Sequence, residues 1–299
     1  MHLDGVLIRD SFAEAFPMAA TRLVLTAATA GWARTAAQSL TGFATSVIGC
    51  GCEAGIEREL LPAETPDGRP GVAVLLFAMD RTSLARHLQS RVGQCVLTCA
   101  TAAAFAGLDT PDRLPLGRAL RFFGDGYQAS KRLGARRYWR VPAMEGEFLV
   151  EDTVGCTTGI GGGNFLILAE TATAALRAAE AAVAAIAGQP GVILPFPGGV
   201  VRSGSKVGSR YKGLIASTND AYCPGLRGRA PASALPPEVG SVLEIVLDGL
   251  DRDAIERATV AGIRAACGLG RTGGIVAIDA GNYGGKLGPH HFHLRELLA

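Results

Sequence analysis

The stretch Ser241-Val-Leu-Glu-Ile-Val-Leu247 has the composition of a β-strand that is covered on both faces. Because side chains alternate along a strand, Glu244 shares its face with Val242 and Val246, and the opposite face is entirely apolar. Burial raises the pKa of a carboxyl group and favours the neutral acid. Such an acid can donate a proton near pH 7, which makes Glu244 a candidate general acid. Two ordinary alternatives stay open: a salt bridge to an arginine, or an edge strand facing water.

The composition indicates a globular protein that takes no part in nucleic-acid binding. The 299 residues suffice for one large domain or two lobes, and 48% of them are hydrophobic, enough for a substantial core. The net charge is only +2 and the aromatic share 6%, so the chain offers neither a basic tract nor a stacking platform for bases.

No targeting or membrane segment is expected. Residues 1–10 carry Asp4, Arg9 and Asp10 instead of a basic start followed by an apolar run. The most apolar segment, 172–187, is short and contains Arg177 and Glu180. We therefore expect a soluble, cytoplasmic protein that does not bind membranes.

The cysteines and histidines do not form a recognisable metal motif. There are seven cysteines, and Cys50-Gly-Cys52 and Cys95-x-x-x-Cys99 do not have zinc-ribbon spacing. Free thiols in a reducing compartment are the simpler interpretation. His290-His-x-His293 could bind a metal, but no distant cysteine or carboxylate motif joins it, so we expect no metal site.

Hydrophobic patterning predicts two successive βαβ arrangements in each half of the chain. In the first half, strands are expected at 22–28, 44–48, 72–77 and 95–98, helices at 31–40 and 82–91, and a loop-rich passage at 53–71. In the second half, strands are expected at 164–168, 191–194, 241–247 and 274–278, and helices at 172–187 and 251–267.

This succession predicts an α+β fold with two ferredoxin-like α/β-sandwich lobes, each a split βαβ repeat with a largely antiparallel sheet. The boundary is expected within 142–152, which gives an N-terminal (distal) lobe at 1–147 and a C-terminal (proximal) lobe at 148–299. One continuous α/β sheet is the alternative.

Several polar, glycine-rich loops are candidate parts of a site. They are Phe122–Tyr127 with Asp125, Gly159–Asn164, Ser203–Ser209 with Lys206, Ala216–Pro224, and Ala280–Gly288 with Lys286. Gly159–Asn164 precedes a strand instead of a helix, so it does not fit a dinucleotide-binding fingerprint. Solvated turns are the ordinary interpretation of such loops, but long ordered loops are more often functional.

Along essentially its whole length the chain closely resembles the formylmethanofuran–tetrahydromethanopterin formyltransferase family. The matching segments include Phe12-Ala-Glu-Ala-Phe16, Thr65-Pro-Asp-Gly-Arg-Pro-Gly71, Gly93-Gln-Cys-Val96, Phe122-Phe-Gly-Asp-Gly-Tyr127, Ser205-Lys-Val-Gly-Ser209, Ala216–Pro224 and Gly284-Gly-Lys-Leu-Gly288. Matches in this order over both halves are far more specific than any single motif.

The resemblance implies direct transfer of a formyl group between the amine of a methanofuran-type coenzyme and N5 of tetrahydromethanopterin, in one-carbon (formaldehyde oxidation) metabolism. Both coenzymes are substrates, and no tightly bound cofactor is implied. The family's catalytic carboxylate is a glutamate in the strand that matches Val242–Asp248, which gives Glu244 that role. The family also implies a homotetramer, built as a dimer of dimers.

The matched loops supply the substrate-binding residues that we expect. Arg69, Lys206 and Lys286 are the candidates to meet the acidic tails of the two coenzymes. The complete expected set is Arg69, Gln94, Asp125, Lys206, Ser217, Asn219, Asp220, Asn282 and Lys286.

Arginine outnumbers lysine by 25 to 4 and the net charge is +2, whereas archaeal members of the family are strongly acidic. The chain therefore resembles the bacterial formyltransferase subunit of a formyltransferase/hydrolase complex, which implies hydrolase and other subunits as partners. Two rival classes stay open. One is a non-catalytic scaffold subunit, and the other is a cysteine hydrolase that uses Cys223 or Cys95 with a nearby histidine such as His87.

Overall fold

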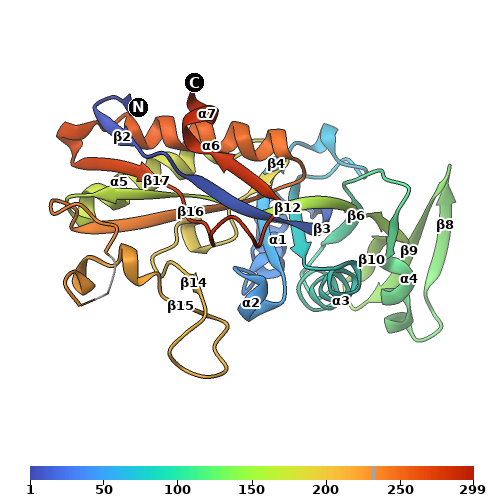
Figure 1. The fold of residues 1–299 in the computed structure, drawn as a ribbon. Coiled ribbons are helices and arrows are strands. Elements are labelled where there is room, and N and C mark those ends of the chain that lie inside the picture. The colour runs from blue at the N-terminus through green and yellow to red at the C-terminus, as the bar shows by residue number, and fades with distance from the viewer. Residues whose placement is uncertain (230–232) are drawn as a thin grey trace. The chain divides into compact units, whose positions relative to one another are not determined.

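The computed structural model describes residues 1–229 and 233–299, which form two compact units (Figure 1). Unit 1 consists of Met1–Pro17, Ile160–Ala187 and Phe196–Ala299. Unit 2 consists of Met18–Gly159 and Gly188–Pro195. The first residues of the chain thus belong to the same unit as its C-terminal half. Two long strands have residues in both units, β3 (Phe12–Thr26) and β12 (Thr157–Ala169).

Unit 2 contains the ferredoxin-like succession that the sequence predicts for the first half. Its βαββαβ elements are β3, α1 (Ala30–Thr41), β4 (Glu53–Leu60), β5 (Gly71–Ala78), α3 (Arg81–Arg91) and β6 (Ala103–Ala106). The strand order is β4-β5-β3-β6, and all three pairings are antiparallel. The mostly antiparallel pairing confirms the α+β class.

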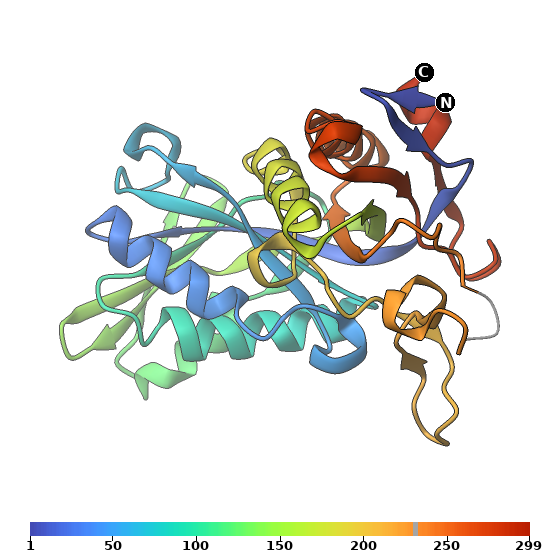
Figure 2. The ribbon, with the colours of Figure 1, turned by 90° about the vertical axis from the view of Figure 1, so that its left-hand side faces the viewer.

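The helices of unit 2 are held on the sheet by small and branched apolar side chains. Ala33, Ala37 and Leu40 of α1 are fully buried, as are Leu84 and Leu88 of α3. They pack in one core with the inward-facing residues of the strands. Figure 2 shows the two helices side by side on the same side of the sheet.

The sheet of unit 2 continues beyond β6 through further strands. They are β10 (Gly146–Glu151), β9 (Arg136–Ala143) and β8 (Ala129–Leu133). Smaller elements complete the unit: α2 (Val47–Cys50), β7 (Arg113–Pro115), α4 (Gly117–Leu120), β11 (Thr153–Gly155) and β13 (Val192–Ile193).

Unit 1 has the same succession without its second strand: β12, α5 (Ala172–Ile186), β16 (Ser241–Gly249), α6 (Arg252–Cys267) and β17 (Ile275–Asp279). β12 lies between β16 and β17 and is antiparallel to both. Helices α5 and α6 approach closely at Gly262, where a Cβ atom would lie 2.7 Å from Ile186 and 3.0 Å from Phe165. The Asp251 side chain accepts a hydrogen bond from the Ala254 amide at the start of α6, as its position in the sequence predicts.

The remaining elements of unit 1 are short. They are β1 (His2–Leu3), β2 (Val6–Ile8), β14 (Lys206–Val207), β15 (Ala216–Ser217), β18 (His290–His293) and α7 (Leu294–Leu298). Figures 1 and 2 both show α6 on one side of the unit 1 sheet and the β14–β15 hairpin extending from the other. Within the described residues, no helix is both long and apolar enough to cross a membrane.

Two expected strands of the first half are wrong. The segment 44–48 leads into the one-turn helix α2, which Ser46 caps at its start and Gly51, with φ of 77°, ends. The strand lies further on, at β4, where Glu57 is buried through ion pairing with Arg22. The segment 95–98 extends a π-helical turn at Val92–Val96, and the strand follows at β6.

Candidate active site

Glu244 lies in the middle of β16, between two backbone neighbours. On one side it is in register with Leu166 of β12. On the other, its N–H donates to the Val201 carbonyl at 2.9 Å, and the Val201 N–H donates to its carbonyl at 2.8 Å. Glu244 is therefore not on an open strand edge.

The Glu244 carboxyl group is placed where its charged form is unfavourable. The residue is half-buried, and no hydrogen bond or ion pair to its carboxyl group is found in the part of the chain that the structure describes. Burial raises the pKa of Glu244 from 4.5 to about 7. Within the described residues, Glu244 is therefore neither paired with an arginine nor freely exposed to water.

Apolar side chains lie next to Glu244 on its own face of the sheet. Cross-strand partners share a face, so Leu166 lies beside Glu244. A small hydrophobic cluster that includes Leu166, Leu235 and Val239 covers the face next to it, and Val242 packs against the cluster. Burial, to which these neighbours belong, is the physical reason for the raised pKa.

Val201, which is hydrogen-bonded to the Glu244 backbone, lies just before the Ser203–Ser209 loop that carries Lys206. The Lys206 ammonium lies 2.6 Å from the Asp220 carboxylate, which lowers the pKa of Asp220 through this hydrogen bond. Lys206 and Ser217 are also backbone partners in the β14–β15 ladder. All three residues line a pocket of about 290 Å³, together with Ser209, Arg210, Tyr211, Thr218, Leu226 and Arg229. The pocket thus brings together three of the residues expected from the sequence.

Asn219 lies beside this pocket, between Thr218 and Asp220. Thr218 donates to the Ser203 carbonyl at 3.2 Å, which ties the two loops together. A Cβ atom at Gly204, whose φ is 57°, would lie 3.2 Å from the Asn219 Cβ. The backbone at Gly204 therefore requires both a left-handed conformation and close approach.

The third glycine-rich loop, 280–288, meets the Ser203–Ser209 loop at Tyr283, whose hydroxyl lies 3.3 Å from that of Ser205. Asn282 is exposed at the start of this loop, and its amide donates to the Phe12 carbonyl at 3.3 Å. Lys286 is exposed. Both expected residues are therefore presented on a loop that the structure joins to the Ser203–Ser209 segment.

Glu14 fixes that loop, a role that the sequence patterns did not predict. Its carboxylate is fully buried and accepts hydrogen bonds from four backbone N–H groups, those of Tyr283, Gly285, Leu287 and Gly288. Burial by itself would raise the pKa of Glu14, but the four donors together hold it below its ordinary value. The available signal was a lone acid in the alternating apolar stretch Phe12–Phe16.

Asp279 is a second acid that sequence reasoning missed. It is in register with Leu166 on the opposite side of β12 from Glu244, so the two acids lie on the same sheet face. Asp279 accepts hydrogen bonds from Arg9 and from the Tyr222 hydroxyl, both at 2.7 Å. Burial and the Asp279 carboxylate raise the pKa of Tyr222, which keeps its hydroxyl protonated. The same face therefore carries one carboxylate that is paired with an arginine and one acid whose pKa burial raises to about 7.

Comparison with known proteins shows the family to which the chain belongs. The family model described as "Formylmethanofuran-tetrahydromethanopterin formyltransferase" matches residues 1–143, and that described as "FTR, proximal lobe" matches residues 146–297. A formylmethanofuran–tetrahydromethanopterin formyltransferase from Methylococcus capsulatus is 62% identical over 299 residues, with all of both chains covered. The chain belongs to the formylmethanofuran–tetrahydromethanopterin formyltransferase family.

Other members of this family are similar over their full length. A formyltransferase/hydrolase complex subunit from Methylorubrum extorquens is 56% identical, with 99% of this chain and 97% of that one covered. A crystal structure of the Methylorubrum extorquens complex with methylofuran matches with a TM-score of 0.97, at 55% identity, over 100% of this chain and 99% of that one. The Methanosarcina barkeri enzyme matches with a TM-score of 0.94, at 48% identity, over 99% of this chain and 100% of that one.

Three of the expected residues, Arg69, Gln94 and Asp125, belong to unit 2. The other expected residues belong to unit 1. The Arg69 guanidinium donates to Asp67, Thr101 and Thr26 at 2.7–3.0 Å, so its donors hold the 65–71 turn in place. Gln94 is exposed on the π-helical turn, and Asp125 is exposed with a φ of 50°. Their roles toward a substrate stay predictions.

The contacts of Cys223, one of the two candidate nucleophiles of the cysteine-hydrolase alternative, do not include a histidine within the described residues. The Cys223 thiol lies 3.5 Å from the Thr218 hydroxyl and 3.3 Å from the Asn219 carbonyl, and neither group is a histidine base. No group of three or more histidine, cysteine or acidic side chains that could hold a metal ion is found within the described residues.

Proposed function

We propose that this chain transfers a formyl group between a methanofuran-type coenzyme and N5 of tetrahydromethanopterin, with Glu244 as the proton-transferring residue. The observation that carries the proposal is the half-buried Glu244 carboxyl, whose pKa burial raises to about 7. A general acid or base works best when its pKa is close to the operating pH. Membership in the family supports the choice of substrates.

The proposed step is a direct transfer through a tetrahedral intermediate. The N5 amine attacks the formyl carbon, a new C–N bond forms, and the carbonyl oxygen takes the negative charge. Protonated Glu244 then gives its proton to the nitrogen of the leaving amine as the original C–N bond breaks. The proton lost from N5 restores the acid, so protons and electrons balance over the cycle.

The oxyanion needs hydrogen-bond donors near Glu244. We propose that Asn219 and the backbone N–H groups of the glycine-rich loops supply them, at about 3–4 kcal/mol for each well-placed donor. Lys206, Asp220 and Ser217 line the 290 Å³ pocket beside these loops and are proposed to bind one coenzyme. Arg69, Gln94, Asp125, Asn282 and Lys286 complete the proposed binding set.

The setting of the reaction is also part of the proposal. The relative from Methylorubrum extorquens is named as a subunit of a formyltransferase/hydrolase complex, which supports hydrolase and other partner subunits for this chain. We further propose a homotetramer built as a dimer of dimers, a cytoplasmic location, and two lobes at 1–147 and 148–299. The family models meet between residues 143 and 146, which supports that boundary.

Formyl transfer between the two purified coenzymes tests the function. The wild-type chain, alone or with its candidate partner subunits, is expected to transfer the group, and the Glu244→Gln variant is expected to be slower by on the order of 10²–10⁴. Gln keeps the shape of the side chain but cannot donate a titrating proton. Unimpaired transfer by a folded Glu244→Gln protein would remove Glu244 from the mechanism, and no transfer by wild type under any condition would remove the function.

A further inference from the structure

Unit 2 contains a pocket of about 620 Å³ whose walls are dominated by guanidinium groups. None of the ten site residues expected from the sequence lines it. The cationic side chains come from a short stretch of chain between β7 and β9. They are Arg113, Arg118, Arg121, Arg132, Arg136 and Arg137.

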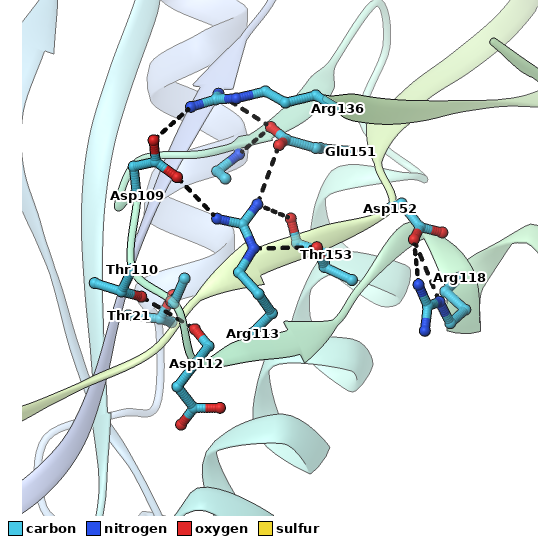
Figure 3. Close-up of polar contacts among 12 residues, drawn as sticks. Thr21, Asp109, Thr110, Asp112, Arg113, Arg118, Arg136, Glu151, Asp152 and Thr153 are labelled. Carbon is cyan, nitrogen blue, oxygen red and sulfur yellow. Dashed lines mark hydrogen bonds and ion pairs between the residues drawn. The ribbon is translucent and has the colours of Figure 1, made fainter. Parts of the chain in front are cut away.

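Two of the three carboxylates in this pocket, Asp109 and Glu151, are engaged by the same two arginines. Arg113 lies 3.3 Å from Asp109 and 3.5 Å from Glu151, and Arg136 lies 4.0 and 3.7 Å from the same two acids. Figure 3 shows both guanidinium groups converging on this acid pair. Glu151 is buried, and the Ala106 amide also donates to its carboxylate at 2.9 Å. The two acids therefore hold two of the arginines in the wall.

The third carboxylate, Asp152, anchors the floor of the pocket. It accepts hydrogen bonds from the Trp139 indole N–H at 2.6 Å and from Arg118 at 2.7 Å (Figure 3 shows the Arg118 contact). Trp139 is buried, so its ring is fixed in both position and orientation. Asp152 is thus paired directly with Arg118, and the charge of Arg137 also acts on it.

The fixed indole positions two arginines that have no carboxylate of their own. The Arg121 guanidinium lies 4.6 Å from the Trp139 ring centroid, and that of Arg137 lies 5.9 Å from it. A guanidinium stacked on an aromatic face keeps the N–H groups at its edge available. Together with Arg132, they are arginines for which no ion pair is found among the described residues.

The pocket thus has three more arginines than carboxylates, in a concavity where charges repel one another more strongly than on open surface. We propose that it binds a small polyanion that carries two or more adjacent phosphate or carboxylate groups, held by Arg121, Arg132 and Arg137. The planar arginine fork matches both kinds of group in a bidentate manner.

The size of the pocket favours a small molecule as the occupant. Its volume falls within the range of small-molecule sites, whereas its lining is too polar for an apolar ligand. A concave wall of converging guanidinium groups surrounds a compact anion more completely than it meets a flat acidic protein surface. The phosphate and carboxylate forms of the ligand share this chemistry, and the experiment distinguishes them.

The test is a fluorescence titration of the full chain that uses Trp139 as the reporter. The chain has two tryptophans, so in a Trp32→Phe background the emission comes from Trp139 alone. Tripolyphosphate and citrate are the two probes, and acetate at matched ionic strength is the reference. Binding of either probe at least about tenfold tighter than acetate supports the proposal, and the tighter of the two identifies the class.

Variants locate the binding in the pocket. The double change Arg132→Ala and Arg137→Ala is expected to weaken binding by about tenfold or more, because two charge-assisted contacts are lost. Arg140→Ala is the matched control, since Arg140 lies on the same strand, pairs with Glu147 and does not line the pocket. If the double variant fails to fold, Arg137→Lys is tested in its place. It keeps the charge but loses the planar fork, so we expect a weakening of probe binding that is smaller than about tenfold. The proposal is overturned if Arg140→Ala weakens binding as much as the double variant does, or if neither probe binds more tightly than acetate. It is also overturned if a purified acidic partner chain binds and neither probe does.

Discussion

The backbone of Glu244 is paired with that of Val201 in both directions, at 2.9 and 2.8 Å. This bridge joins the strand with the candidate acid to the start of the loop that carries Lys206. With Leu166 of β12 as its other neighbour, Glu244 is held by backbone pairing on two sides, and its side chain lies beside an apolar cluster. The rigid sheet therefore holds the acid in place, and the adjoining loops present the polar groups.

The raised pKa of Glu244 predicts a stability cost at neutral pH. Between the unfolded value of 4.5 and the folded value of about 7, the folded state binds more protons than the unfolded state. The stabilising contribution is complete below pH 4.5 and is lost as the pH rises through 7, by up to about 3 kcal/mol. The free energy of unfolding, measured by denaturant titration, should therefore rise in Glu244→Gln relative to wild type as the pH is raised from 5 to 8. A constant difference between the two proteins over this range would contradict the prediction.

The same titration predicts the pH dependence of catalysis. In the direction in which Glu244 donates a proton, kcat should fall as the pH rises through about 7, because the acid form is depleted. The reverse transfer also begins with protonated Glu244, because the proton of the attacking amine restores the acid at the end of each cycle, so kcat should fall over the same pH range in that direction. Initial rates from pH 5.5 to 9 in both directions provide the measurement. The residual rate of Glu244→Gln should lack this inflection, and an identical inflection in the variant would assign it to another group.

Replacing Glu14 should loosen the loop that carries Asn282 and Lys286. Glu14→Ala leaves four backbone N–H groups without their acceptor, and we expect a loss of about 3 kcal/mol in the free energy of unfolding. Amide hydrogen exchange at residues 283–288 should become faster than in wild type. The control is Glu256→Ala, which removes a partly exposed ion pair with Arg252 and should cost less than about 1 kcal/mol. Unchanged exchange in the 283–288 segment of Glu14→Ala would show that Glu14 does not fix the loop.

Reversing the charge of Lys206 should affect substrate binding more than stability. The Lys206–Asp220 pair is partly exposed, so its loss should change the free energy of unfolding by less than about 1 kcal/mol. If Lys206 meets an acidic group of a coenzyme, Lys206→Glu should raise one KM by about tenfold or more, because attraction becomes repulsion. Lys212→Glu is the matched control, since Lys212 is exposed on the same hairpin and does not line the pocket. Equal KM values for Lys206→Glu and wild type would remove Lys206 from the binding set.

The sequence predicted the parts of the fold whose periodicity is strong. The helices α5 and α6 and the strand around Glu244 lie where they were expected, since long amphipathic runs and clear caps determine such elements. β4 was missed because its acids resemble those of a loop, and the ion pair between Glu57 and Arg22 allows one of them to be buried. The apolar segment 95–98 was too short to distinguish a strand from a helical turn.

The site was predictable where a single residue is unusual in its own segment. A glutamate inside an apolar strand made Glu244 a candidate, and hydroxyl-rich loops made Ser217 and Asn219 candidates, whose roles stay predictions. Glu14 and Asp279 could not be found in this way, because their partners lie about 270 residues away in the chain, at Leu287 and Arg9. The arginine pocket was missed for a related reason, since residues that are ordinary along the sequence converge only when β7, β8 and β9 fold together.

The ionisation of Glu244 itself tests the central claim most directly. Infrared difference spectroscopy of wild type against Glu244→Gln, recorded from pH 4 to 9, isolates the C=O stretch of this one protonated carboxyl group. The structure predicts a protonated band that disappears with a midpoint near pH 7. A band that is already lost near pH 4.5, the ordinary value for a solvated glutamate, would contradict the account.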